Sequence, residues 1–353
     1  MQPYKKVLII LIIVFFTVII WHLIMQRMDI LKKIRANQKE GFSLFNTPDN
    51  ELTSVKNIAP VKIQGLNSAY LNQPIRQFCI KSSYNTAVTG KFVNRDMIKY
   101  ALSKGYRYLD FEIFLINDVP SVSYTTDPKY EIIDTDNNIP LSSAFNTVVT
   151  NAFSATSPNK TDPLFINMRI KSNDTSVYKA VANTIYNTLL PKLHSGKITD
   201  DTKMGDIMGQ IVLIMDRTIT PNYANFCTCQ DENCEDLTNY INMESGTSVL
   251  YQTRYSELLN QSSIQINMLL DICSICTDIR HMRVVLPDID YKSISNPNID
   301  KLITDYGAQI VPYRLYSKDG GLTKYEALFD YQKHRSAFVP LANAISYIQE
   351  LNA

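Results

Sequence analysis

The sequence predicts an α/β fold, a (β/α)8 barrel, preceded by a single N-terminal transmembrane helix. Three observations predict it: a long apolar run near the N-terminus, short apolar runs of strand length in the rest of the chain, and amphipathic helical patterns between those runs. Strands that alternate with helices favour a parallel sheet. The roughly 280 residues that remain after position 73 match the size of one such barrel.

The apolar run at residues 7–25 predicts a membrane span. About 19 residues at 1.5 Å each cross a hydrocarbon core of roughly 30 Å. The run is longer than the core of a signal peptide and no small-residue cleavage site follows it, so we expect the anchor to be retained. The expected organisation is an anchor at 1–29, a juxtamembrane helix and tether at 30–73, and one barrel domain at 74–353 with a cysteine-containing insertion around 217–280.

Basic residues are denser after this span than before it, which by the positive-inside rule predicts a single-pass protein whose C-terminal domain is cytoplasmic. Glycosylation sequons at Asn159, Asn173 and Asn260 favour the opposite side, so the sidedness stays open. A membrane is therefore an expected partner. The heavy use of Ile, Asn, Lys and Tyr is typical of an AT-rich genome, which makes a virion or internal membrane of a large DNA virus another candidate location.

Charge and histidine content limit the classes of function. The chain has 35 Lys and Arg against 34 Asp and Glu, so it lacks the basic excess of proteins that bind nucleic acid by bulk charge. Only His22, His194, His281 and His334 are available for acid/base chemistry near neutral pH. We therefore expect no nucleic-acid partner and few sites for histidine catalysis.

The strands and helices of the barrel follow from hydrophobic periodicity. The expected strands are 78–80, 108–116, 164–170, 211–216, 282–287 and 308–313, and the expected helices are 95–105, 141–153 and 176–190. Gly105 is placed to end the first of these helices. In such a barrel, functional side chains gather at the carboxyl ends of the strands.

Two motifs in the first third of the domain carry a family resemblance. KSSYNTAVTG at 81–90 and GYRYLDFEIF at 105–114 resemble the opening of the catalytic X region of phosphoinositide-specific phospholipase C, which reads Ser-Ser-His-Asn-Thr and then has two acidic residues spaced by two. PSVSYTTD at 120–127 and DPLFINMRIKS at 162–172 follow in the family's order. With weaker matches to the Y region at MRVVLPD, YGAQIVPYRL and FDYQKHRSAFVPL, the similarity covers about residues 75–341. It implies a barrel of the phospholipase C-like phosphodiesterase type.

The resemblance also implies that the catalytic residues are replaced. The family's two catalytic histidines fall on Tyr84 and Tyr124, and tyrosine, with a pKa near 10, is a poor base at neutral pH. Asn85, Asp110 and Glu112 fall on calcium ligands, which are hard oxygen donors, but the remaining ligand position is Arg169.

Two alternatives follow for this degenerate calcium site. In one, Arg169 pairs with Asp110 and Glu112 and replaces the metal, as an arginine does in bacterial members of the superfamily. In the other, it is a barrel-end residue without a role. Arg283 falls where the family holds a phosphate, which allows a residual anion pocket; its alternative is a solvated arginine at a strand end.

Five cysteines lie in two groups within the expected insertion: Cys227, Cys229, Cys234, Cys273 and Cys276. Short spacings of this kind are compatible with a zinc site, with disulfides, or with free thiols, and the pattern does not decide between them.

The combined expectation is a membrane-anchored pseudoenzyme that serves as a binding or structural module, with a phosphoinositide headgroup or a protein as its ligand. The alternative is an active phosphoric diester hydrolase of the phosphatidylinositol phospholipase C type with a rebuilt active site. We expect no cofactor in the first case, and calcium only if the protein is active.

Overall fold

The computed structural model describes residues 47–56, 61–227, 235–259, 281–289 and 295–352, together with Trp21. The chain divides into two compact units, residues 1–46 and residues 47–353. The description below concerns the second unit.

The predicted transmembrane anchor is contradicted. Among the residues that the structure describes, no helix is long and apolar enough to cross a bilayer. The longest of these helices, α5 (Ser176–Thr188), has 13 residues, which at 1.5 Å each gives about 20 Å against the roughly 30 Å of a hydrocarbon core. Residues 7–25 themselves lie outside the described residues except for Trp21. Three further predictions depended on this helix and are wrong for the same reason. They are the single-pass localisation, the orientation in the membrane and the membrane partner.

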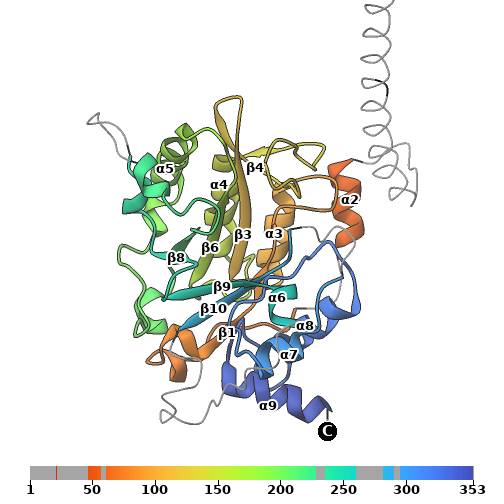
Figure 1. Cartoon of the computed structure of the whole chain (residues 1–353). Coiled ribbons are helices and arrows are strands. Elements are labelled where there is room, and N and C mark those ends of the chain that lie inside the picture. Colours follow the sequence, from red (N-terminus) through yellow and green to blue (C-terminus); the bar gives the residue numbers. More distant parts are fainter. Residues whose placement is uncertain are drawn as a thin grey trace, which may run out of the picture. The chain divides into compact units, whose positions relative to one another are not determined.

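A nine-stranded sheet forms the middle of the unit (Figure 1). Six of its strands run parallel in the order β10, β9, β8, β7, β6, β3. Their bounds are β3 (Tyr108–Ile116), β6 (Leu164–Ile170), β7 (Ile211–Asp216), β8 (Met243–Ser245), β9 (Leu250–Arg254) and β10 (Met282–Leu286). The short β2 (Ser82–Ser83) pairs in parallel with β3. The runs of Ile, Val, Leu and Phe in these strands are typical of parallel strands that are covered on both faces.

The complete (β/α)8 barrel is not confirmed, although pairings extend the parallel path beyond β10. Isolated parallel bridges join Ile310 to both Val284 and Ile80, and Tyr313 to Ser83. The predicted strand at 308–313 is thus present only as bridges. The strands and helices also do not alternate regularly. Strands β8 and β9 are separated by only the four residues 246–249, which are too few for a helix.

Antiparallel strands add a further departure from the predicted barrel. The strands β4 (Val119–Ser123) and β5 (Ile139–Pro140) extend the sheet beyond β3, and β1 (Phe78–Ile80) pairs with β11 (Phe338–Pro340). Asn117 and Asp118, with φ of 49° and 62°, form the tight turn between β3 and β4. Two successive residues with positive φ match the twist of a hairpin, and Asn and Asp tolerate this conformation better than most residues.

Helices lie outside the strands in Figure 1, and three of them confirm the periodicity argument. The α-helices are α2 (Pro48–Val55), α3 (Arg95–Ser103), α4 (Leu141–Ala152), α5, α6 (Tyr255–Leu259), α7 (Ile299–Thr304), α8 (Gly320–Asp330) and α9 (Leu341–Asn352). Short 3-10 helices span Ser68–Tyr70, Ile75–Gln77, Leu190–Lys192, Met204–Ile207, Tyr223–Phe226 and Leu237–Asn239. Helix α3 begins at the Asn94 cap, and the positive φ of 78° at Gly105 turns the chain into β3.

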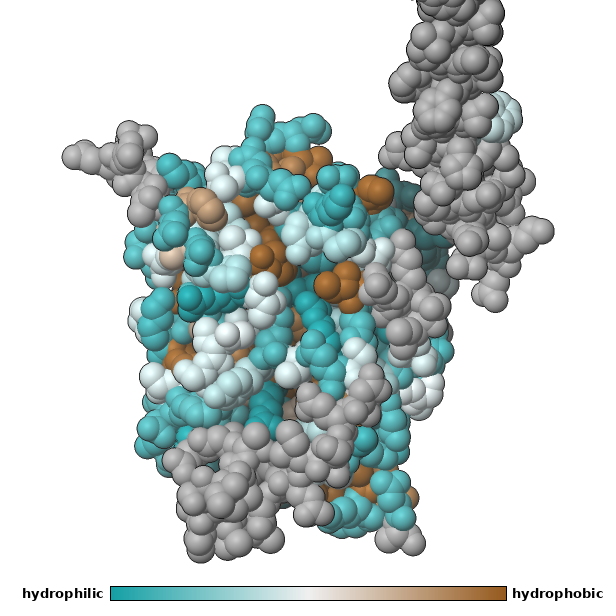
Figure 2. All heavy atoms as spheres, viewed as in Figure 1, coloured by the Kyte–Doolittle hydropathy of each residue, from teal (hydrophilic) through white to brown (hydrophobic). Residues whose placement is uncertain are grey.

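The core is continuous and lies between the sheet and its helices. All residues of β6, residues 108–114 of β3 and the inward faces of α3, α4 and α5 are buried. On the face shown in Figure 2, apolar residues are interspersed among hydrophilic ones. Among the buried charged side chains, a group on β3 and β6 forms the candidate site.

Candidate active site

Two neighbouring parallel strands place the charged side chains of the candidate site. Asp110 and Glu112 are two residues apart on β3, so both side chains point to the same face of the sheet. In the register of β3 with β6, Asp110 lies opposite Asn167 and Glu112 lies opposite Arg169. The alternation of side chains along the two strands, together with this register, therefore brings the two carboxylates and the guanidinium together.

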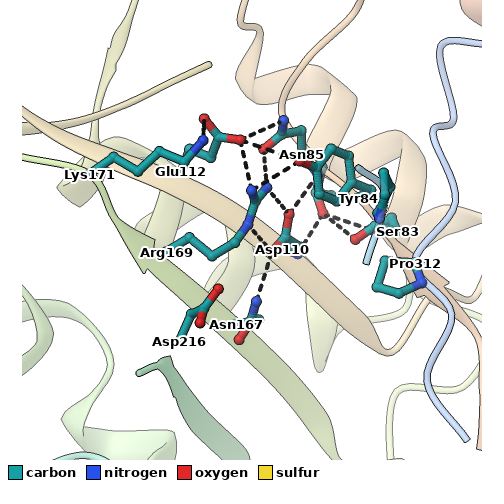
Figure 3. A network of polar contacts seen from close by, with 12 residues as sticks. Ser83, Tyr84, Asn85, Asp110, Glu112, Asn167, Arg169, Lys171, Asp216 and Pro312 are labelled. Atoms are coloured by element: carbon teal, nitrogen blue, oxygen red, sulfur yellow. Dashed lines mark hydrogen bonds and ion pairs between the residues drawn. The ribbon is translucent and has the colours of Figure 1, made fainter. Parts of the chain in front are cut away.

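The guanidinium of Arg169 makes a two-pronged ion pair with Asp110 (Figure 3). Nε donates to Oδ1 of Asp110 at 2.9 Å, and Nη2 donates to Oδ2 at 2.6 Å. Both side chains are buried, with 1% and 0% of the surface exposed. Charge-assisted bonds in this parallel geometry are the strongest that the two groups can form.

The remaining donors of Arg169 are also used within the same cluster. Nη1 donates to Oε1 of Glu112 at 2.8 Å and to the hydroxyl of Tyr84 at 3.0 Å, while Nη2 also donates to Oδ1 of Asn85 at 2.8 Å. The guanidinium carbon lies 4.3 Å from the centre of the Tyr84 ring, within the range of a cation–π interaction. Arg169 thus occupies the point on which Tyr84, Asn85, Asp110 and Glu112 converge.

Asn85 is held by the same carboxylates through its backbone and its amide. Its backbone N–H donates to Oδ2 of Asp110 at 3.0 Å, and its Nδ2 donates to Oε1 of Glu112 at 3.2 Å. Its φ of 44° lies in the left-handed region, which asparagine tolerates better than most residues. The turn after β2 therefore fixes Asn85 against both acidic residues.

Sequence reasoning missed two further members of the cluster. Lys171 Nζ lies 3.0 Å from Oε2 of Glu112, and Asn167 Nδ2 donates to Oδ1 of Asp110 at 2.8 Å. Thr125, after β4, adds a backbone N–H to Oε2 of Glu112 at 3.0 Å and accepts from Lys171 Nζ at 3.2 Å. The signal for Asn167 and Lys171 was present, because residues spaced by two about Arg169 share one face at the end of β6.

Opposing effects set the charge states of the cluster. Burial by itself raises the pKa of Glu112, but Arg169 and Lys171 outweigh it and hold the pKa below the ordinary range. Burial likewise lowers the pKa of Lys171, and this effect exceeds the attraction of Glu112. The pKa of Tyr84 is raised, chiefly by burial, so its phenol keeps its proton at neutral pH.

The residues present do not fit a calcium ion. Asn85, Asp110 and Glu112 are oxygen donors of the kind that calcium prefers, but each already accepts a hydrogen bond from the Arg169 guanidinium. A positive side chain at the centre repels a dication. Within the described part of the chain, no group of three or more His, Cys, Asp and Glu residues is placed to hold a metal.

The second tyrosine and three of the histidines make contacts with residues other than Arg169. Tyr124 directly follows β4 and is buried, with its carbonyl oxygen accepting the Asp134 N–H at 2.8 Å. His281 pairs with Asp200 at 2.8 Å, and His194 contacts Gln210 at 2.6 Å. The ring of His334 packs against those of Tyr331 and Tyr347. These partners differ from those of Arg169, and His22 lies outside the described residues.

Arg283 and the cysteines were candidates elsewhere in the sequence. Arg283 is the second residue of β10 and its Nη1 donates to the carbonyl of Tyr306 at 2.8 Å, and the anion pocket at this residue stays a prediction. Cys227 is buried and its thiol lies 3.3 Å from the carbonyl oxygen of Tyr223. Cys229, Cys234, Cys273 and Cys276 lie outside the described residues. The choice between zinc, disulfides and free thiols stays open.

Known proteins share the architecture but little sequence. No family model and no curated protein matches the sequence. The crystal structure of PLC21 from L. pealei aligns with a TM-score of 0.59 and 13% identity over 80% of this chain, and that of PLC21 from S. officinalis with 0.57 and 13% over 84%. A calcium-dependent phosphoinositol-specific phospholipase C from Pseudomonas sp. aligns over 74% of this chain with 10% identity and a TM-score of 0.47.

The alignments reach only part of the two PLC21 proteins. This chain spans 39% of the L. pealei protein and 40% of the S. officinalis protein. At this level of identity the likeness establishes architecture, and it confirms the fold that the resemblance predicted. The chain has a phospholipase C-like phosphodiesterase fold.

Proposed function

We propose that this protein is a pseudoenzyme of the phospholipase C-like fold, a binding or structural module without phosphodiesterase activity. The observation that carries the proposal is the placement of Arg169, whose guanidinium bonds to Asn85, Asp110 and Glu112 together. These residues match the family's calcium ligands, and an arginine among them fills the position that a catalytic metal needs. The arrangement satisfies the carboxylates internally.

The second support is the absence of a suitable acid/base pair at the matching positions. Hydrolysis of a phosphodiester needs groups that take up and release a proton near neutral pH, and each contributes about 10²- to 10⁴-fold to the rate. Tyr84 holds its proton because its pKa is raised by burial. Its hydroxyl also accepts a hydrogen bond from Arg169 at 3.0 Å, which fixes its orientation.

The alternative function is a phosphoric diester hydrolase that uses Glu112 or Asp110 as its base. Glu112 is poorly suited to this role, because its pKa lies below the ordinary range and its oxygens are bonded to Arg169, Lys171 and Thr125. Asp110 is fully buried and held by two nitrogen atoms of Arg169. The contacts therefore favour the pseudoenzyme. As a binding module its candidate ligands are a phosphoinositide headgroup and a partner protein.

The test is a hydrolysis assay of the purified full chain on phosphatidylinositol in detergent micelles, with calcium and with a chelator. We expect no release of inositol phosphate in either condition. The triple variant Tyr84→His, Tyr124→His, Arg169→Glu provides the comparison, because it restores the residue types of the family motif. Calcium-dependent turnover by the triple variant alone would support the residue assignments, and robust turnover by the wild-type chain would refute the proposal.

A further inference from the structure

Outside the candidate site, the Glu51 carboxylate on helix α2 is bound by a four-residue loop that follows the site in the sequence. Oε2 of Glu51 accepts from the hydroxyl of Thr89 at 2.6 Å and from the backbone N–H of Phe92 at 3.1 Å. The backbone N–H of Lys91 donates to Oε1 at 3.0 Å and to Oε2 at 3.1 Å. Backbone and hydroxyl donors that converge on an anion form a specific receptor for a carboxylate.

A glycine makes this close approach possible. Gly90 has a φ of 142°, and a Cβ atom at this position would lie 2.8 Å from Oε1 of Glu51. A larger residue would therefore strain the backbone and require the Glu51 carboxylate to shift. The backbone conformation of the loop 89–92 thus leaves space for the Glu51 carboxylate and directs its donors toward it.

Besides this carboxylate, further contacts with described residues hold α2 on the domain. Two of its side chains, Leu52 and Val55, are buried in the core. The amide of Asn94 donates to the Asp49 carboxylate at 3.1 Å and to a backbone carbonyl at the start of the helix at 3.3 Å. An eight-residue helix does not persist in water by itself, so these contacts and the Glu51 receptor determine whether α2 stays folded on the domain.

The loop that receives Glu51 also anchors the segment 125–137, here called the lid. The backbone N–H of Asp136 donates to the Lys91 carbonyl at 2.8 Å. Asn137 makes two bonds with Val93, accepting its N–H at 2.7 Å and donating to its carbonyl at 2.9 Å. One end of the lid is therefore bonded to the residues beside the Glu51 receptor.

Residues in the first part of the lid contact the candidate site. Thr125 donates its backbone N–H to Glu112 at 3.0 Å and accepts from Lys171 at 3.2 Å. The Lys171 ammonium lies 5.6 Å from the centre of the Tyr130 ring, which belongs to the lid. Lys171 is only 5% exposed and Glu112 is 0% exposed.

We propose that α2 is a strap: Glu51, seated in the loop 89–92, holds that loop in the shape that anchors the lid, and release of α2 frees the lid from the Glu112–Lys171 end of the site. The strap acts through the loop, since the contacts run from Glu51 to Lys91 and from there to Asp136. The proposal does not depend on whether the site is catalytic. It assigns a regulatory role to a short helix and to one carboxylate.

Hydrogen exchange of the full chain, followed by mass spectrometry, tests the strap. In Glu51→Ala we expect exchange to rise by about tenfold or more in the segments 89–94 and 125–137, with β7 (Ile211–Asp216) unchanged as the internal reference. Glu51→Gln keeps the shape but not the charge, so its increase should be smaller. Glu350→Gln removes a carboxylate whose side chain is 55% exposed and should change neither segment.

Acylation of Lys171 by an amine-reactive ester gives an independent readout of the lid. Opening exposes its ammonium, so Glu51→Ala should be modified at Lys171 several-fold faster than the wild type, while the exposed Lys333 reacts at the same rate in both. A second variant, Leu52→Ala, weakens the packing of α2 without altering the receptor and should raise exchange in the same two segments. A rise in 89–94 without one in 125–137, or an equal rise that includes β7, would overturn the proposal.

Discussion

Arg169 on β6 and Asp110 on β3, which are diagonal neighbours in the register of the two strands, form a two-pronged ion pair with N–O distances of 2.6 Å and 2.9 Å and no more than 1% of either side chain exposed. Taking two charges out of water is costly, and the cost is recovered only when the geometry is good and the other polar atoms are satisfied. Glu112, Asn85, Asn167 and Tyr84 supply those further bonds. The cluster therefore tolerates the loss of a partner poorly.

Removal of the guanidinium should destabilise the fold strongly. Arg169→Met leaves two buried carboxylates without their main counterion, for which we expect a loss of about 3–5 kcal/mol in the free energy of unfolding. Urea denaturation followed by circular dichroism measures it. The matched control is Lys333→Met, which breaks an exposed pair with Glu350 and should change the free energy of unfolding far less than Arg169→Met does, because solvent screens exposed pairs. Equal losses in the two variants would show that the buried cluster contributes no more to the free energy of unfolding than an exposed ion pair does.

The low pKa of Glu112 predicts a dependence of stability on acid pH. Because the folded state holds this pKa below the ordinary value of 4.5, ionised Glu112 stabilises the fold fully above that pH, and the contribution is lost as the pH falls through the folded-state pKa. Glu112→Gln should therefore be less stable than the wild type at pH 7, and the difference should narrow below pH 4.5. Urea unfolding at a series of pH values measures this difference. If the difference in stability between Glu112→Gln and the wild type stayed constant down to the acid transition, the low pKa of Glu112 would be contradicted.

Asp162 predicts a pH effect of the opposite sign. It is buried, and burial raises its pKa from 3.8 to about 6, even though Oδ1 accepts the Leu66 N–H at 2.8 Å. The protonated form is favoured in the folded state, so its stabilising contribution is complete below pH 3.8 and is lost as the pH rises through about 6. The loss is on the order of 1–3 kcal/mol.

Asp162→Asn removes this titration. The variant should gain stability relative to the wild type between pH 4 and pH 7, as measured by thermal unfolding at both values. Asp206→Asn, at a largely exposed cap that accepts the Lys203 N–H at 3.0 Å, serves as the control and should show no such gain. A shift of the same size in both variants would argue against Asp162 as the titrating group.

Periodicity predicted the elements of the fold better than their assembly. The strands at 78–80, 108–116, 164–170 and 211–216 appear with the predicted bounds, because each is a run of apolar, strand-forming residues. The assembly depends on short segments and on turns. The hairpin made by Asn117 and Asp118 and the three-residue β8 carry no strong periodic signal, so a regular barrel could not be distinguished from the observed sheet.

The sequence predicted those residues of the candidate site that belong to the motifs, but not the residues outside them. The motifs located Tyr84, Asn85, Asp110, Glu112 and Arg169, and the structure brings all five into contact. The motif position of Tyr124 gave no indication of its partners, because contacts across a loop depend on the path of the chain. The Glu51 receptor was invisible for the same reason, since residues about 40 positions apart meet there only in the folded protein.

The central claim, that Arg169 holds the place of a metal, is tested most directly by calorimetric titration of calcium into the wild-type chain and into Arg169→Glu. Circular dichroism of both proteins verifies that they are folded before titration. We predict no saturable heat for the wild type and binding of one calcium ion by the variant, because the substitution removes the positive charge and adds an oxygen ligand beside Asn85, Asp110 and Glu112. Saturable binding by the wild type that Asp110→Asn abolishes would contradict the claim.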